Sequence, residues 1–302
     1  MLGYCEGGFV MTTLNIPQWD YNFWFYPGPD GIGDWVVSYF HSGHFYCNYS
    51  ETTGPSVEDS AEKQEVIAAF QIFKQRPEYK LVQYMRSGIS MPDSVTSDQI
   101  DILADAYNEC LAGAILLRHL TSYKDANIGI RRVSTMIEWL SNNKFYSAPA
   151  SSQYHESFSG GLLYHSVKVL NEMIKLYKLE CFQNERIESI AIAALTHDWC
   201  KIGLYHTYLR NVKNEDTGKW EQREAYKREL TGIPMGHGST STYYVQKFIP
   251  LTDAEALAIR WHMGIWYCHD AEVNDLQKAN ECYPLVHMLQ FADQLAITNY
   301  VN

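Results

Sequence analysis

The sequence predicts a mainly helical protein that carries a short β-hairpin insertion and begins with a smaller region of mixed α and β structure. Three observations support this fold class. From residue 56 onward, apolar residues recur at the three-to-four spacing of amphipathic helices. Residues 12–55 instead combine aromatic residues with Pro/Gly turns. A polar segment at 207–226 has two strand-like arms around a central turn.

The first 55 residues are the aromatic region. The stretch YNFWFYPGPDGIGDWVVSYFHSGHFYC predicts two short strands around a Pro/Gly turn, and hence a small sheet or hairpin layer. His41, His44 and Cys47 lie close enough in sequence to suggest a metal site. We favour the simpler interpretation, in which they are exposed residues of a tyrosine-rich strand pair.

Residues 56–127 are expected to form a helical N-terminal region. SVEDSAEKQEVIAAFQIFKQR has acidic residues early and basic residues late, which suits the helix dipole. SDQIDILADAYNECLAGAILLRHL predicts a long amphipathic helix. Residues 128–302 are expected to form a separate domain. Its helices are predicted from 129 to just before Pro149, and at 162–178, 185–199, 239–248, 252–263 and 284–298.

Local signals mark some of these boundaries. Thr252 and Glu255 predict a capping box at the start of one helix, and Gly264 is a candidate for its end. Pro284 suits the first turn of the last helix. The tetrapeptide at 216–219, Asp-Thr-Gly-Lys, is the expected turn of the hairpin.

Composition limits the classes of partner. The formal net charge is −11 and no run of Lys or Arg forms a patch, so a large nucleic-acid footprint is not expected. An acidic chain can still bind a phosphorylated substrate if metal ions supply positive charge.

The seven cysteines are scattered without a CxxC pair, which is typical of reduced thiols. With no basic leader and no apolar run of transmembrane length, we expect a cytoplasmic protein with no membrane partner.

Six side chains with metal-binding chemistry occur at helix ends or inside apolar helices. A single buried histidine is most often a hydrogen-bonded core residue, but a carboxylate in an apolar helix is costly unless it is paired or bound to a metal. Imidazole and carboxylate ligands suit Mn, Fe, Co, Ni or Zn. Six ligands suit two divalent transition metal ions that share a bridging carboxylate. The six residues are His165, His197, Asp198, His237, His262 and Asp293.

At this point the chain resembles the HD-domain metal-dependent phosphohydrolase superfamily. GGLLYHS, HDWCKIG, GHGSTS, IRWHMG and FADQLA carry the resemblance, which covers roughly residues 128–302. The adjacent His197-Asp198 pair matches the defining doublet of that family, and the chain is similar to small bacterial and phage HD hydrolases. The resemblance implies a helical HD domain of the binuclear subgroup. There His165, His197, Asp198 and Asp293 would hold one metal, His237 and His262 the second, and Asp198 would bridge them.

The reaction that the resemblance implies is hydrolysis of a phosphoester or phosphoanhydride, with a nucleotide as the expected substrate. A metal-bridged hydroxide would attack phosphorus, and the metals would absorb the developing charge. Asp198 and Lys201 would be the catalytic residues. Lys201 follows the doublet as in the HDxxK variant and would contact the substrate phosphate or stabilise the transition state; the alternative is a solvated surface lysine.

Two other parts of the sequence are candidates for substrate binding. His155 precedes the pair Gly160–Gly161, as in similar family members, and is either a substrate or metal-supporting residue or a surface residue. Arg210 lies in the hairpin, which would sit near the mouth of the site. Together with Lys213 and Arg223 it could form a lid for anionic substrates, although ordinary surface positions are slightly favoured.

Other functions fit parts of the same pattern. A di-iron oxygenase on the HD fold can use the same six ligands. An HD-class 3′-to-5′ exoribonuclease would need a nucleic-acid-binding module that the net charge does not support. A non-catalytic binding protein would usually lack one of the six ligands. Residues 1–125 carry no family resemblance, and the sequence leaves open whether they cap the site, bind a partner or form a homo-oligomer.

Overall fold

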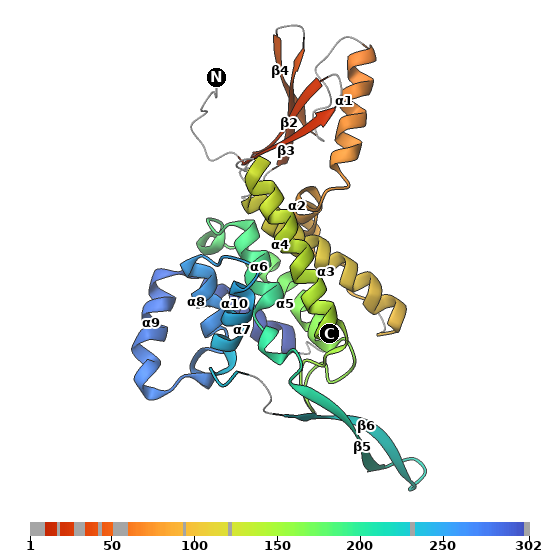
Figure 1. Ribbon diagram of the computed structural model, residues 1–302. Coiled ribbons are helices and arrows are strands. Elements are labelled where there is room, and N and C mark those ends of the chain that lie inside the picture. The colour runs from red at the N-terminus through yellow and green to blue at the C-terminus, as the bar shows by residue number, and fades with distance from the viewer. Residues whose placement is uncertain are drawn as a thin grey trace.

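The computed structural model describes residues 10–16, 19–26, 34–41, 44–50, 60–92, 95–119, 123–229 and 233–298. Within these ranges the chain forms ten α-helices, a four-stranded sheet and a two-stranded hairpin (Figure 1). The predicted mainly helical fold with a short β-hairpin is therefore confirmed.

The N-terminal sheet has more strands than the sequence predicted. It is an antiparallel meander with its strands in chain order, and helix α1 (Ser60–Phe73) follows it. Two strands were expected, but strand-forming residues before the aromatic stretch supply one outer strand, and the end of that stretch, from His44 onward, begins the other. The four strands are β1 (Val10–Ile16), β2 (Trp19–Tyr26), β3 (Asp34–His41) and β4 (His44–Ser50).

The helix expected at 56–76 spans Ser60–Phe73 in the structure, and a further helix begins at the proline that follows. α1 ends at Phe73, and α2 (Pro77–Ser87) begins with Pro77 in its first turn. A proline in a helix interior removes a hydrogen bond and clashes with the preceding turn, whereas at the first helical position it does neither. α2 was not predicted. Two longer helices follow, α3 (Ser97–Arg118) and α4 (Tyr123–Asn142).

The remaining helices follow the predicted order, with one addition. The unpredicted helix is α9 (Val273–Cys282), which follows a pair of 3₁₀ turns. The predicted helices correspond to α5 (Gly161–Leu176), α6 (Ile187–Thr196), α7 (His237–Gln246), α8 (Asp253–Trp261) and α10 (Pro284–Ile297). The predicted capping box is present at α8, where Thr252 and Glu255 cap each other reciprocally.

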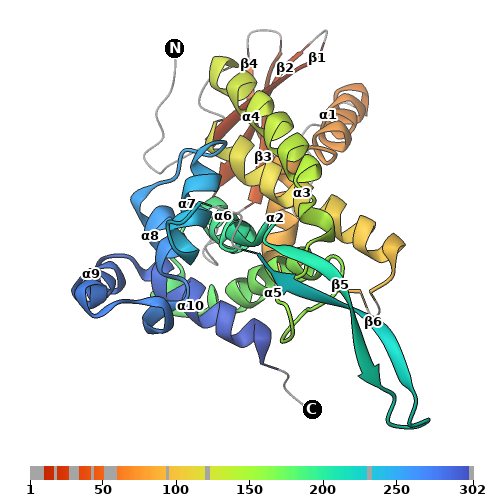
Figure 2. The same cartoon turned by 60° about the horizontal axis from the view of Figure 1, so that its bottom comes forward.

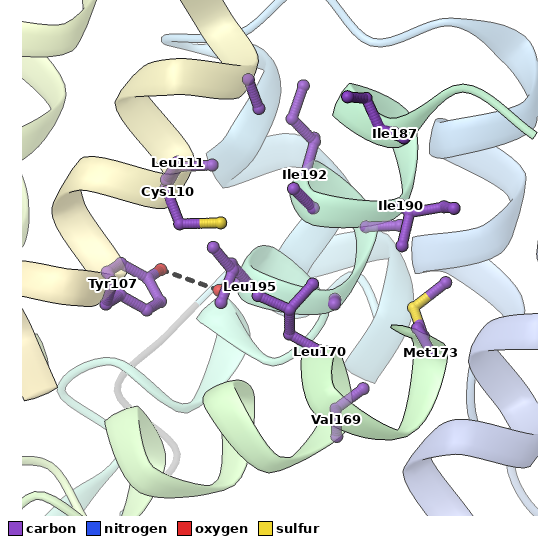
Figure 3. Packing of buried hydrophobic residues seen from close by; sticks show 14 of the residues in the cluster. Tyr107, Cys110, Leu111, Val169, Leu170, Met173, Ile187, Ile190, Ile192 and Leu195 are labelled. Carbon is purple, nitrogen blue, oxygen red and sulfur yellow. Dashed lines mark hydrogen bonds between the residues drawn. The ribbon is translucent and has the colours of Figure 1, made fainter. Parts of the chain in front are cut away.

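Helix α6 is the centre of the core. All ten of its residues are buried and seven of them are apolar, as expected for a helix surrounded by others. Figure 3 shows its apolar side chains between α3, which contributes Cys110 and Leu111, and α5, which contributes Leu170 and Met173. α10 packs against both α5 and α8. The C-terminal end of α6 is thus held in place by neighbours on several sides.

The hairpin lies outside this core. Its strands are β5 (Tyr205–Lys213) and β6 (Trp220–Arg228), paired from Tyr205 with Arg228 to Lys213 with Trp220. It projects away from the helices in both views (Figures 1 and 2), and most of its residues are exposed. Among the described residues, no helix is long and apolar enough to span a membrane.

Candidate metal centre

The six metal-capable residues predicted from the sequence meet in one place. His165 lies in the second turn of α5, and Asp293 lies in α10. His197 and Asp198 directly follow α6, His237 is the first residue of α7, and His262 directly follows α8. Their ligand atoms form overlapping groups of three, each with its atoms within 4.8 Å of one another. His165, His197, Asp198 and His262 are all at least 98% buried.

Asp198 occupies the middle of this cluster, and its two carboxylate oxygens face different histidines. Oδ2 lies 3.4 Å from His197 Nε2 and 3.7 Å from His165 Nε2. Oδ1 lies 2.8 Å from His237 Nε2 and 3.5 Å from His262 Nε2. The carboxylate therefore divides the four imidazoles into two pairs.

Asp293 completes one of the two pairs. Its Oδ1 lies 3.0 Å from His165 Nε2 and 3.9 Å from His197 Nε2, so it joins the pair that faces Asp198 Oδ2. The imidazole rings form a continuous row, with centroid separations of 5.3 Å from His165 to His197 and 4.9 Å from His197 to His262. His237 ends the row, 5.1 Å from His262.

Hydrogen bonds to backbone carbonyls fix the orientation and the protonated nitrogen of two of the imidazole rings. His197 Nδ1 lies 2.8 Å from the carbonyl of Ala194, and His262 Nδ1 lies 2.8 Å from that of Ile259. A carbonyl can only accept, so each Nδ1 carries the proton in these bonds and each Nε2 of the neutral ring presents a lone pair. Both Nε2 atoms are buried without a hydrogen-bond partner among the described residues. Buried polar atoms of this kind are rare in stable folds, and they suit metal coordination.

The electrostatics of the cluster favour ionised carboxylates. Burial alone would raise the pKa of Asp198, but the Lys201 ammonium and the neighbouring imidazoles outweigh burial and hold that pKa well below its usual range. The pKa of Asp293 is likewise lowered, because hydrogen bonding to His165 and the nearby His197 outweigh its burial. Burial opposes the charge on Lys201 as well, but Asp198 raises the pKa of its ammonium group above the usual value.

The pKa values of two imidazoles shift in opposite directions. Burial lowers the pKa of His237, so this ring favours its neutral, metal-binding form. Burial also acts to lower the pKa of His197, but there the carboxylates of Asp198 and Asp293 outweigh burial and raise the pKa. Protons and metal ions therefore compete most strongly at His197.

The structure brings in an acidic residue that the sequence did not indicate. Glu156 Oε2 lies 3.7 Å from His165 Nδ1, on the opposite side of that ring from Asp293, and Glu156 Oε1 accepts a hydrogen bond of 2.7 Å from Lys168. Glu156 has a φ of 44°, which is uncommon for a non-glycine residue. Gly161 permits this segment to approach closely, because a Cβ on Gly161 would lie 1.9 Å from the Glu156 carbonyl oxygen. Nothing in the local sequence reveals this conformation.

Cys200 is a second residue that sequence analysis did not connect with the cluster. Its Sγ lies 3.1 Å from His237 Nδ1, and its backbone N–H donates to Ser241 Oγ at 3.0 Å. Burial raises the pKa of the Cys200 thiol to about 12, so it remains protonated near neutral pH. The thiol therefore lies within 3.7 Å of both ring nitrogens of His237, and one of them, Nε2, also faces Asp198.

A buried tyrosine holds the chain on both sides of the His197-Asp198 pair. The Tyr107 hydroxyl donates to the carbonyl of Leu195 at 2.7 Å (Figure 3) and accepts from Trp199 Nε1 at 3.0 Å. Tyr107 and Trp199 are both fully buried. Tyr107 thereby connects α3 to the segment that presents the two central side chains.

We expect Tyr107→Phe to destabilise the protein by about 1–3 kcal/mol, because it leaves the Trp199 N–H and the Leu195 carbonyl buried without this partner. Chemical denaturation of the metal-free protein measures this loss. Tyr154→Phe removes a hydroxyl from a ring that is 85% exposed and serves as the control. Equal stability of the two variants would contradict the anchoring role.

Of the three residues predicted to bind substrate, two lie beside residues of the metal-capable cluster and the third lies in the hairpin. Lys201 Nζ lies 2.6 Å from Asp198 Oδ2, and the Lys201 side chain is only 12% exposed, so it is not a solvated surface lysine. The His155 ring lies 5.1 Å from the His165 ring at the edge of the cluster. Arg210, with Arg223 as its cross-strand neighbour, is exposed halfway along the projecting hairpin. Lys213 is also exposed and lies at the far end of β5.

The side chains of His41, His44 and Cys47 lie outside the described part of the structure.

Comparisons of the whole chain with models of protein families, with curated proteins and with solved structures find no match.

Proposed function

We propose that this protein is a metal-dependent phosphohydrolase that cleaves a phosphoester or phosphoanhydride, with a nucleotide as the expected substrate. One observation carries the proposal: the two oxygens of a single buried carboxylate, Asp198, each face a separate pair of histidines. This is the arrangement that a bridging ligand between two ions requires. The resemblance of the sequence to HD-domain hydrolases gives the same interpretation.

The residues present fit two divalent transition metal ions. His165, His197 and Asp293, with Asp198 Oδ2, would hold one ion, and His237 and His262, with Asp198 Oδ1, would hold the other. A donor set of nitrogen and carboxylate oxygen suits Mn, Fe, Co, Ni or Zn. When bound, two such ions lower the pKa of a shared water and polarise a phosphoryl oxygen.

The chain itself contributes charge and orientation around that position. Lys201 is the buried cation closest to Asp198 and would stabilise negative charge on the phosphoryl oxygens in the transition state. Its raised pKa keeps it protonated near neutral pH. His155 borders the cluster beside His165, where burial lowers the pKa of its ring and favours a neutral hydrogen-bonding partner for the substrate.

The direct test is a hydrolysis screen. Protein loaded in turn with Mn, Fe, Co, Ni, Zn or Mg is given nucleoside mono- and triphosphates, cyclic nucleotides and dinucleoside polyphosphates, and all nucleoside, nucleotide and phosphate products are separated and measured by chromatography. We expect turnover that depends on the metal and is abolished by chelation. Metal-loaded protein that hydrolyses none of these compounds, but consumes oxygen when loaded with iron, would contradict the hydrolase and identify an oxygenase.

A further inference from the structure

A cavity of about 320 Å³ lies next to the metal centre and shares one residue with it. That residue is His237, whose Nε2 faces Asp198 while its side chain also lines the cavity. The cavity lies among the start of α7, the end of α8 and the two 3₁₀ turns that follow α8. Its volume is at the lower end of the range for small-molecule sites and far exceeds the space that a phosphate group needs.

One wall of this cavity carries an exposed aromatic side chain. Tyr267 lines the cavity and is 53% exposed, and its ring lies 5.5 Å from the His237 ring with an interplanar angle of 37°. It directly follows Ile265 and Trp266, which are 58% and 80% exposed. Consecutive exposed apolar side chains that end at a cavity are typical of a binding surface.

The other wall is polar and held in place by its own contacts. Arg260 Nη2 donates to Glu272 Oε1 at 2.7 Å, and the Arg260 guanidinium stacks 4.0 Å above the Trp261 ring. Glu272 also accepts from the backbone N–H of His269. A planar ligand here would have a tyrosine ring at its face and charged or polar groups at its edge.

We propose that this cavity binds the base of the substrate, a planar nitrogen-containing ring of the kind found in nucleotides. The inference rests on the proposed phosphohydrolase function, since it places the phosphate at the metal centre and the base beyond His237. An aromatic face with a polar rim suits a heteroaromatic ring better than a bare sugar phosphate, which has no face for Tyr267 to stack on. Tyr267 is the specificity-determining residue in this arrangement.

The test begins with the binding of nucleosides to metal-free protein, because the base should bind to the cavity without any contribution from the metal centre. Calorimetry would measure the affinity for adenosine, guanosine, cytidine and uridine, and for ribose 5-phosphate as the baseless comparison. We expect at least one nucleoside to bind, and Tyr267→Ala to weaken that binding by about tenfold, the loss expected for one aromatic stacking partner. Tyr267→Phe keeps the ring and should restore the affinity.

Metal-loaded protein supplies the second readout. We expect Tyr267→Ala to raise KM for the preferred nucleoside monophosphate by about tenfold with a small change in kcat, and so to reduce the preference for that compound over ribose 5-phosphate. Metal content of each variant shows whether His237 still supports the centre. Tyr208→Ala removes a partly exposed tyrosine from the distant hairpin and is the matched control, expected to behave as the unmodified protein.

The outcomes separate this inference from the function on which it rests. Nucleoside binding that depends on the Tyr267 ring, without hydrolysis of any compound in the screen, would support the base site and overturn the hydrolase. Phosphate release with equal preference for ribose 5-phosphate and nucleotides, unchanged by Tyr267→Ala, would support the hydrolase and overturn the base site. Loss of metal together with loss of kcat in Tyr267→Ala, without a change in nucleoside binding, would also overturn it and assign Tyr267 to the support of His237.

Discussion

Asp198→Asn is expected to reduce phosphate release by more than about a hundredfold and to reduce the metal content of the protein. Altering residues that merely orient a ligand costs 10–100-fold in metal affinity or activity, and a carboxylate shared by two ions should cost more. Asparagine has nearly the same volume, but its amide offers one acceptor oxygen and an NH₂ group, so it cannot face both histidine pairs as an acceptor. Metal analysis after gel filtration and the nucleotide hydrolysis assay would measure the two effects.

The same substitution also leaves Lys201 buried without its carboxylate partner, and we expect the metal-free variant to lose about 3–5 kcal/mol of stability. Activity is therefore measured at a temperature at which circular dichroism shows the variant to be folded. Asp216→Asn changes an exposed residue of the hairpin turn and is the matched control. A folded Asp198→Asn protein that binds the usual amount of metal and turns over at the unmodified rate would contradict the bridging role.

Gly161→Ala should produce a large loss of stability from a small change, about 3 kcal/mol or more. A Cβ at this position would lie 1.9 Å from the carbonyl oxygen of Glu156 and 3.1 Å from the backbone nitrogen of Ala150, and neither backbone atom can rotate away. Either the 150–160 loop or the start of α5 must move, and severe steric conflict of this kind is among the mechanisms behind large mutational effects. Because α5 carries His165 and the loop carries His155, metal affinity should fall as well.

Gly218→Ala is the informative control for this substitution. Gly218 has a φ of 67° in the hairpin turn, but no heavy atom lies within 4 Å of the position of its missing Cβ. The cost there is only that of a left-handed conformation for an L-residue, roughly 1–2 kcal/mol. Urea denaturation of the two metal-free variants compares the costs. If Gly161→Ala were no more destabilising than Gly218→Ala, the contact with Glu156 would not be a rigid one.

The sequence predicted the parts of the fold that have strong local patterns. The mostly apolar run of α6 and the capping box of α8 are both readable from neighbouring residues, and both are present. α2 was not predicted, although Pro77 lies in its first turn, a position that suits proline. α9 was missed because its short, mostly polar sequence has only two buried residues, Leu276 and Ala279, to mark an inner face.

The clustering of the six metal-capable residues was also predictable, because histidines and carboxylates in apolar helices are conspicuous. The surroundings of the cluster were not. Glu156 appears in the sequence as an ordinary loop acid, and its positive φ depends on packing against Gly161. Cys200 and Tyr267 reach His237 only through the folding of α7 beside the chain that follows α6 and α8. Conversely, the position of the hairpin between Asp198 and His237 in the sequence suggested that Arg210 lies near the cluster. In the structure the hairpin projects from the helices, and Arg210 lies halfway along it.

The β5–β6 hairpin separates the metal-capable residues into two sets along the chain, which is useful for engineering. His165, His197 and Asp198 precede the hairpin, and His237, His262 and Asp293 follow it. A break at the turn around Gly218 would yield two peptides, each with three of the six metal-capable residues, whose helices interlock in the core. Neither peptide could assemble the cluster alone, so the chain is suited to fragment complementation. In such an experiment, recovered metal binding would show that the two peptides had associated.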